Sequence, residues 1–306
     1  MTKRSDYPIT QLLNYSITQL PNFQMLRFSK AHAYGNDFLY VRRDAVAAAP
    51  FDALARELCE RHTGIGADGL IVYEPRPDGA SMQLFNADGS RSEVSGNGVR
   101  GLAAILLCDR ESAGTAAENA PEGASGAETD VVTIYTEGGV KRLTRTAREG
   151  SRHTFRAAMG IPEGLRQVTI GVSNESLQAA VMMFGNPQCV VLGPLPEDDR
   201  FERLGPALER HPMFPDRTNV EFAVVEWPDL VRIRIWERGV GPTTSSGTGS
   251  CASLIAAAAF GGAARDATVI APGGSQRVDW RDDNVYLTGW AEVVFDGEWL
   301  RAESSY

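Results

Sequence analysis

The chain has 306 residues, of which 43% are hydrophobic and 23% charged, as in a folded globular protein. Thirty Lys and Arg against 39 Asp and Glu give a formal net charge of −9, which disfavours nucleic-acid binding because a phosphate backbone requires cationic side chains. The 4 cysteines and 4 histidines lack metal-ligand spacing, so we expect neither a zinc site nor a disulfide framework. No apolar run is long enough for a bilayer and no signal peptide is evident, so we expect no membrane partner and a cytoplasmic location.

The first 24 residues differ from the rest of the chain. The segment Ile9–Tyr15 recurs, slightly changed, as Ile17–Phe23. We interpret residues 1–24 as an extension outside the fold, with Met25 as the natural start. Two domains are expected in the remainder, residues 25–150 and residues 151–306, with the last strand returning to the first domain.

Hydrophobic patterning in the first half predicts strands separated by helices. A strand over Leu26–Val41 is interrupted at residues 33–37, and Phe51–Glu60 has helical spacing with Asp52 as its N-cap. Residues 111–130 have no periodicity and are expected to form a surface loop. Further predicted elements are strands at Leu70–Tyr73 and Met82–Phe85, a helix at Val99–Leu107, and a hairpin of Val131–Tyr135 with Val140–Leu143.

The second half repeats this order of elements. The predicted elements are strands at Val181–Phe184, Val220–Val225 and Leu230–Trp236, a helix within Leu195–His211, a buried helix at Cys251–Phe260, and strands from Val269 onward. Strand-rich modules that each contain a glycine-opened helix indicate the α+β class.

Two serine motifs mark the repeat. Ser95-Gly96-Asn97-Gly98 and Ser246-Gly247-Thr248-Gly249 each precede an apolar helical run, and their serines are 246 − 95 = 151 residues apart. Glycines at a helix start allow backbone N–H groups to converge on an anion, and the helix dipole adds to the attraction. We therefore expect one module used twice, with the two serine turns facing each other across a cleft.

The motifs together resemble the diaminopimelate epimerase family, from Met25 to the C-terminus. That family has two pseudo-symmetric α+β domains, each a β-rich layer around a central helix, with the active site between them. The segments that carry the resemblance are Gly35-Asn36-Asp37-Phe38, Arg61–Leu70, Phe85–Ser90, Gly96-Asn97-Gly98, Gly185-Asn186-Pro187, Arg217–Phe222, Trp236–Gly241 and Gly247-Thr248-Gly249.

The resemblance implies inversion of a carbon next to a carboxylate without pyridoxal phosphate, so no cofactor is expected. In the family, one cysteine thiolate removes the α-proton and a second cysteine thiol protonates the opposite face. Here Ser95 and Ser246 occupy the cysteine positions, Gln188 stands where the family has a histidine, and Pro242 replaces a glutamate. Because an alkanol is a far weaker acid than a thiol, a serine relays a proton only beside a base. Glu237 is the remaining acidic candidate.

The resemblance also implies a binding site for a small zwitterionic amino acid. Asn86, Asn219 and Arg238 match the residues that hold the distal end of the substrate, where arginine suits bidentate carboxylate recognition. The other matching substrate contacts are Asn36, Asn97 and Asn186, together with the carboxylate-binding turns at Gly96 and at Gly247-Thr248. Considered without the resemblance, Arg238 could form a structural ion pair and the asparagines could cap turns.

Three functions are compatible with these residues. The leading hypothesis is an epimerase of diaminopimelate or a similar amino acid in lysine and peptidoglycan precursor synthesis. The second is a one-base isomerase or dehydratase, and the third is an amino-acid-binding pseudoenzyme. The expected assembly is a monomer or a homodimer.

Overall fold

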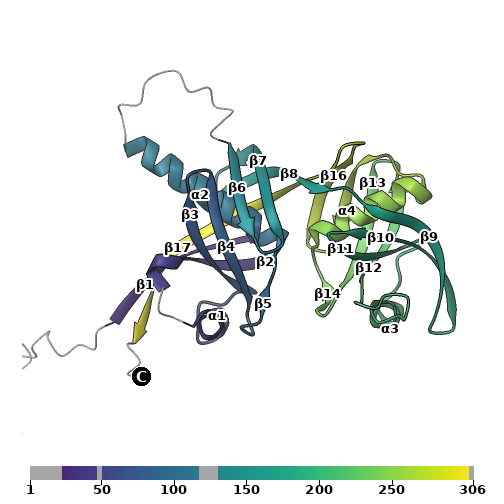
Figure 1. The fold of residues 1–306 in the computed structure, drawn as a ribbon, viewed down its shortest axis with the longest axis horizontal. Helices are drawn as coiled ribbons and strands as arrows, with labels where there is room; N and C mark the ends of the chain where they lie inside the picture. The colour runs from purple at the N-terminus through teal and green to yellow at the C-terminus, as the bar shows by residue number, and fades with distance from the viewer. Residues whose placement is uncertain (1–22, 47–49, 117–129, 303–306) are drawn as a thin grey trace, which may run out of the picture.

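The computed structural model describes residues 23–46, 50–116 and 130–302. Figure 1 shows two strand-rich lobes side by side, with β17 (Val285–Ala302) running from one into the other. Most of the expected extension at residues 1–24 lies outside the described residues, and residues 23 and 24 begin β1 (Phe23–Ala33). Among the described helices, none is long and apolar enough to cross a membrane.

The first lobe is formed by the N-terminal half of the chain (Figure 1). Its helix α2 (Gly96–Ala116) packs apolar residues such as Leu102 and Ile105 against the inner face of the strands. Besides β1, the lobe contains β2 (Asn36–Arg42), the 3-10 turn η3 (Arg43–Val46), α1 (Phe51–Cys59), β3 (Gly69–Arg76), β4 (Gly79–Asn86), β5 (Arg91–Ser92), β6 (Val131–Thr136), β7 (Gly139–Glu149) and β8 (Arg152–Gly160).

The second lobe surrounds α4 (Gly247–Ala256), whose residues from Gly249 to Ala256 are all buried. A π-helical turn, η4 (Ala257–Gly261), continues this helix. The strands and the remaining helix are β9 (Glu163–Val172), β10 (Glu175–Phe184), β11 (Asn186–Leu192), α3 (Asp198–Glu209), β12 (Asn219–Trp227), β13 (Leu230–Glu237), β14 (Gly241–Thr243), β15 (Asp266–Ala271) and β16 (Gly274–Trp280).

The pairing of strands follows the same pattern in both lobes. β2 runs parallel to β3 across α1, and β11 runs parallel to β12 across α3. β4 then runs parallel to β6 across α2, and β13 runs parallel to β15 across α4. The predicted α+β class and the similar topology of two pseudo-symmetric halves around central helices are therefore confirmed.

Strand β17 joins the two lobes. Its first residues pair antiparallel with β16 of the second lobe, from Val285↔Trp280 to Thr288↔Arg277. Its other edge pairs with β8, and its last residues pair with β1, as in Leu300↔Met25. The 17 described strands consequently form one hydrogen-bonded sheet.

The expected domain limit between residues 150 and 151 falls in the turn between β7 and β8. Phe155 on β8 packs in the same hydrophobic cluster as α2. The division into residues 25–150 and 151–306 stays a prediction. Because Phe155 packs with the first lobe, we propose that the boundary lies a few residues further along the chain, beyond Phe155.

The helices and strands predicted from the sequence are largely confirmed, with two errors. Asp52 is not the N-cap of α1: the N-cap is Pro50, which has no side-chain cap, and Asp52 forms an ion pair with Arg56 at 2.6 Å. Residues 111–116 continue α2 rather than forming loop, because alanine and glutamate favour helix even without an apolar stripe. The rest of that expected loop, residues 117–129, lies outside the described residues.

A pair of Leu→Ala variants tests the core assignment. Leu102 on α2 is fully buried, whereas Leu300 on β17 is 62% exposed. We expect Leu102→Ala to lower the free energy of unfolding by about 2–5 kcal/mol, because it removes buried methyl groups and leaves a cavity. Leu300→Ala should change it by less than about 0.5 kcal/mol. Denaturant unfolding measures both, and equal effects would contradict the described packing.

Candidate functional site

Both predicted serines stand at the start of a central helix. The Oγ of Ser246 is the N-cap acceptor of α4 and accepts a hydrogen bond from the N–H of Gly249 at 3.1 Å. The Oγ of Ser95 accepts one from the N–H of Gly98 at 3.2 Å, three residues on in the same way. Each half-buried hydroxyl therefore lies at the positive end of a helix dipole, where negative charge is stabilised.

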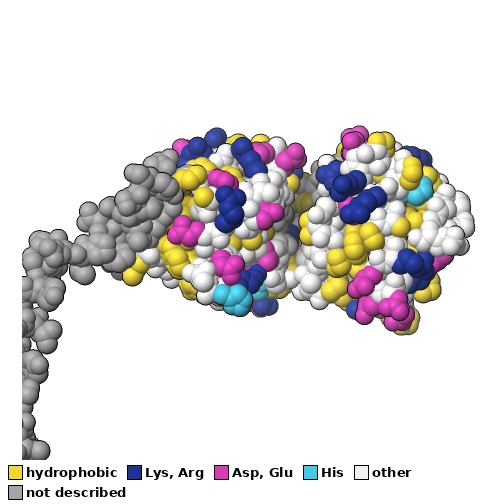
Figure 2. Space-filling view, turned by 90° about the horizontal axis from the view of Figure 1, so that it is seen from below, with side chains coloured by type: hydrophobic (Ala, Val, Ile, Leu, Met, Phe, Trp, Pro, Cys, Tyr) yellow, Lys and Arg dark blue, Asp and Glu magenta, His cyan; other side chains and the backbone are white. Residues whose placement is uncertain are grey.

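The two helix starts contact one strand that both lobes share. A methyl group at Gly247, in the first turn of α4, would lie 3.1 Å from Cδ2 of Leu287 on β17. A methyl group at Gly289, two residues further on, would lie 3.3 Å from Cζ of Arg100, the fifth residue of α2. Residues two apart point to the same face of a strand, about 7 Å apart. Both helix starts therefore reach the same strand, and Figure 2 shows the surface hollowed between the two lobes. That the two serine turns face each other across this hollow stays a prediction.

Asn36 and Asn97 are hydrogen-bonded to each other beside the Ser95 turn. Nδ2 of Asn97 donates to Oδ1 of Asn36 at 3.2 Å, and Nδ2 of Asn36 donates to Oδ2 of Asp68 at 2.7 Å. Asp68 also receives a bond from Arg61 at 2.8 Å, and Asp37 pairs with Lys30 at 2.9 Å. This ionic network fixes the orientation of Asn36, because Asp68 can only accept from its amide.

Asn86 is the last residue of β4 and is exposed. Its Nδ2 donates to Oγ of Ser90 at 2.9 Å, and its backbone N–H donates to the carbonyl oxygen of the same residue at 2.8 Å. The next residue, Ala87, donates its N–H to the carbonyl oxygen of Asp68. Asn86 is thereby brought to the same turn region as Asn36.

In the second lobe, Asn219 joins two predicted site segments. Its Oδ1 accepts the backbone N–H of Arg238 at 2.9 Å, and its Nδ2 donates to the carbonyl oxygen of Pro187 at 3.5 Å. The guanidinium of Arg238 is exposed and donates to the backbone oxygen of Asp216 at 3.2 Å. No carboxylate pairs with Arg238 among the ion pairs of the described residues, so the structural ion-pair interpretation has no support.

Glu209, at the end of α3, supports the turn that carries Glu237 and Arg238. It is almost fully buried, and its two carboxylate oxygens accept from Nε1 of Trp236 at 3.1 Å and from the N–H of Gly239 at 3.0 Å. Although burial opposes ionisation, these bonds leave the pKa of Glu209 below its usual value. The carboxylate therefore holds the turn in place as a charged acceptor.

A buried glutamate lies beside the Ser246 turn. Glu221 on β12 has no exposed surface, and burial, with a further contribution from Glu237, raises its pKa well above the ordinary 4.5. A methyl group at Gly249 would lie 2.7 Å from Oε1 of Glu221 and 3.1 Å from Oγ of Ser246, so both oxygens border the same small space. The buried amide of Gln188 contacts the carboxyl group of Glu221 and donates to Oδ1 of Asn186.

Glu237, the acidic candidate from the sequence, is half-buried at the end of β13. Burial raises the pKa of its carboxyl group. The thiols of Cys189 and Cys251 are fully buried, and burial raises the pKa of both. Neither thiol is thus available as a thiolate to replace the missing cysteines.

Two charged residues at this site, Glu221 and Arg100, are not predicted from the sequence. Arg100 is 5% exposed, lies over the ring of Tyr34 at 5.6 Å, and donates to Oδ1 of Asn97. Glu221 stands between Val220 and Phe222 in a segment buried on both faces of β12. A carboxylate inside such an apolar run was the signal available in the sequence, because a buried charge requires a partner or a raised pKa.

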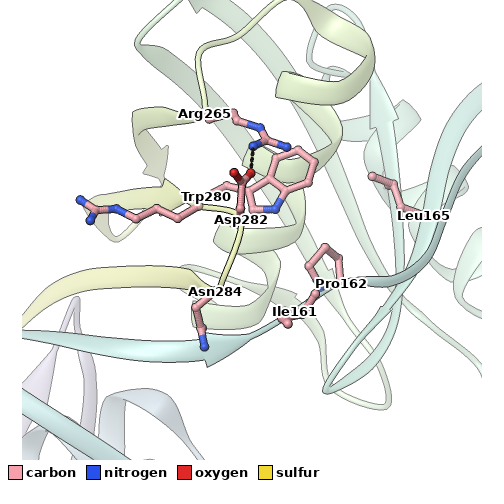
Figure 3. A pocket seen from close by; sticks show the side chains of 8 residues that line it. Ile161, Pro162, Leu165, Arg265, Trp280, Asp282 and Asn284 are labelled. Carbon is pink, nitrogen blue, oxygen red and sulfur yellow. Dashed lines mark hydrogen bonds and ion pairs between the residues drawn. The ribbon is translucent and has the colours of Figure 1, made fainter.

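No group of three or more His, Cys, Asp or Glu side chains suitable for a metal ion occurs within the described residues. A surface pocket of about 270 Å³ lies at the edge of the second lobe (Figure 3). Its walls include Ile161, Pro162 and Leu165, and Arg265 forms an ion pair with Asp282 at 2.8 Å above the ring of Trp280. None of the predicted site residues lines this pocket, and we assign it no function.

Comparison with known proteins gives consistent results. A family profile described as Diaminopimelate epimerase matches residues 28–154 and 180–294. Proteins named diaminopimelate epimerase from Desulforudis audaxviator and Desulfitobacterium hafniense are 39% and 35% identical to this chain, covering 90% and 88% of it and 100% and 96% of their own lengths. A crystal structure of a hydroxyproline epimerase from Agrobacterium vitis has a TM-score of 0.60 at 16% identity, covering 93% of this chain and 95% of that one, which indicates a shared fold.

The raised pKa of Glu221 predicts a pH-dependent stability. Between pH 4.5 and the folded pKa, the folded state keeps a proton that the unfolded state loses, so stability falls as pH rises, by up to about 1.4 kcal/mol per pH unit. In the Glu221→Gln variant the side chain at this position cannot ionise. The free energy of unfolding of the variant, relative to that of the unchanged protein, should therefore increase from pH 5 to pH 8. Denaturant unfolding across that range measures the difference. A pH-independent difference would contradict a neutral Glu221.

Proposed function

Because the chain belongs to the diaminopimelate epimerase family, we propose that it inverts the α-carbon of diaminopimelate without pyridoxal phosphate. It is an amino-acid epimerase or racemase by family, which corresponds to a role in lysine biosynthesis. The observation that supports this most strongly is the pair of N-capping serine hydroxyls on two helices that contact β17 two residues apart. Two proton-transfer groups on opposite sides of one carbon are what an inversion requires.

We infer that Ser95 and Ser246 act at the two faces of the α-carbon and that Glu237 takes part as an acid or base. A free alkoxide is not accessible near neutral pH, so each serine can only relay a proton to a base as it receives one. The carboxyl group of Glu237 is suited to this because burial raises its pKa toward neutrality. Compared with a thiol pair, slow turnover is expected.

The proposed substrate contacts fall into two groups. The N–H groups at Gly96 and Asn97 and at Gly247 and Thr248 would bind the α-carboxylate, because both pairs belong to helix first turns. Asn86, Asn219 and Arg238 would hold the distal amino-carboxylate end, with Arg238 exposed and lacking a carboxylate partner among the described residues. Asn36 and Asn186 would complete the binding site.

We also infer a partner, an assembly and a location. The amino-acid substrate is the proposed partner, and a monomer or a homodimer is the proposed assembly. A cytoplasmic location remains a prediction from the sequence. One-base isomerisation and amino-acid binding without turnover are less favoured, because relatives over nearly the full length are named diaminopimelate epimerase.

Solvent-deuterium exchange at the α-carbon tests the function directly. LL- and meso-diaminopimelate are incubated separately with the protein in D₂O, and both deuterium content and stereochemistry are measured. We expect exchange together with inversion from either isomer. Exchange without inversion would support one-base chemistry, and binding without exchange would support a pseudoenzyme. No binding by calorimetry would contradict the proposed substrate.

Replacing both serines tests whether the alcohol groups limit the rate. We expect Ser95→Cys combined with Ser246→Cys to raise kcat for epimerisation on the order of 100-fold, because a thiol at a helix N-terminus yields thiolate near neutral pH. Ser245→Cys, at the buried neighbour of Ser246, controls for the effect of adding a thiol. A double variant no faster than the unchanged protein would mean that Gln188, Pro242 or the cleft geometry limits catalysis.

A further inference from the structure

We propose that Glu221 is the proton reservoir behind Ser246: its carboxyl group exchanges a proton with the Ser246 hydroxyl each time that hydroxyl exchanges one with the substrate. This inference rests on the proposed epimerase function and adds a residue that acts through Ser246 without touching the substrate. Glu221 is therefore a positioning and relay residue rather than a catalytic one.

The geometry of the α4 first turn supports this pairing. Oε1 of Glu221 and Oγ of Ser246 border the same space beside Gly249, at 2.7 and 3.1 Å from where a methyl group on that residue would lie. Glycine at this position keeps side-chain atoms out of the space that both oxygens border. The two oxygens form no hydrogen bond with each other among the described residues, so proton transfer requires the Ser246 or Glu221 side chain to turn toward the other. Glu221 makes no ion pair among the described residues, so its carboxyl group is not neutralised by a fixed cation.

The surroundings of Glu221 can accommodate both of its protonation states. With Glu221 as an acid, its O–H can donate to Oε1 of Gln188, while Nε2 of Gln188 donates to Asn186. With Glu221 as a carboxylate, the Gln188 amide can make a half-turn. Its Nε2 then donates to both carboxylate oxygens of Glu221, at 3.1 and 3.2 Å, and its Oε1 accepts from Nδ2 of Asn219 at 3.3 Å. The Asn186 amide then turns as well, so that it donates to Gln188. A relay requires such a switch, because its reservoir is charged for part of each cycle.

The proton balance of the relay is simple. When Oγ of Ser246 takes the α-proton, the hydroxyl proton of Ser246 passes to the Glu221 carboxylate, and the C–H electron pair stays on the substrate as an enolate. In the opposite direction, the hydroxyl proton of Ser246 moves to the α-carbon and the Glu221 acid returns a proton to Oγ. The hydroxyl is neutral before and after each step, so no free alkoxide forms.

Glu221→Gln tests the relay on one face of the substrate. The glutamine keeps the volume and the hydrogen-bonding capacity but cannot store the proton. We expect inversion to fall at least 100-fold, while α-deuterium exchange persists for the one isomer whose proton faces Ser95 and is lost for the other. Full inversion in the variant would overturn the relay. Equal loss of exchange from both isomers would also overturn it, because that outcome indicates a merely structural role.

Gly249→Ala tests the same path with the carboxyl group retained. Its methyl group would lie 2.7 Å from Oε1 of Glu221 and 3.1 Å from Oγ of Ser246 and so would crowd both oxygens, whereas alanine is well tolerated within a helix. We again expect α-deuterium exchange to be lost only for the isomer whose proton faces Ser246. Unchanged inversion would contradict proton transfer between Glu221 and Ser246. Glu226→Gln is the matched control: the residue lies on the same strand, β12, is bonded to Arg232 rather than to the site, and should leave inversion unchanged.

A third measurement is independent of turnover. The infrared difference spectrum between neutral and alkaline pH shows the carbonyl stretch of a protonated carboxyl group. We expect this band in the unchanged protein and in Glu226→Gln, and we expect a weaker band in Glu221→Gln. Absence of this band from the unchanged protein would overturn the proposed relay. If the unchanged protein shows this band but exchanges no α-proton of diaminopimelate, the proposed epimerase function is wrong, whereas the protonated Glu221 is retained. Failure of the proposed function can therefore be told apart from failure of the Glu221 relay.

Discussion

One strand holds both halves of the site in register. The first residues of β17 lie between β16 and β8, and its later residues pair with β1, so neither lobe has a complete sheet without it. On the same strand, Leu287 contacts the α4 turn and Gly289 admits Arg100 from the α2 turn. The two helix starts thus reach the same face of one extended strand at positions about 7 Å apart.

The N-cap bond imposes a chemical constraint at each turn. Because Oγ of Ser95 and of Ser246 already accepts a helix N–H, that bond favours negative charge on the oxygen but uses one of its lone pairs. A thiolate in the same position would gain from the bond directly. A hydroxyl gains only while its proton is leaving, which explains why neighbouring carboxyl groups matter more in this chain than they would beside a thiol.

Much of the fold was predictable because its signals are local. Glycine-serine turns, apolar helices and alternating strands predicted the two halves, whose repeated pairing the structure confirms. Asp52 was wrongly assigned as an N-cap because its pairing with Arg56 competes with capping. Glu221 and Arg100 were missed for a different reason: their surroundings come from residues far away in sequence, such as Gln188 for Glu221 and Gly289 for Arg100. Spacing along the chain carries no signal for such contacts.

The pairing of the two ends of the chain has a consequence for folding. Met25 on β1 pairs with Leu300 on β17, so one edge of the first lobe stays open until the C-terminal residues have been synthesised. Contacts of such large sequence separation slow folding, since the intervening chain must be ordered first. Until then β1 and β8 present unpaired edges, which are templates for association with other chains. The strand that joins the two lobes is therefore synthesised after every other described strand.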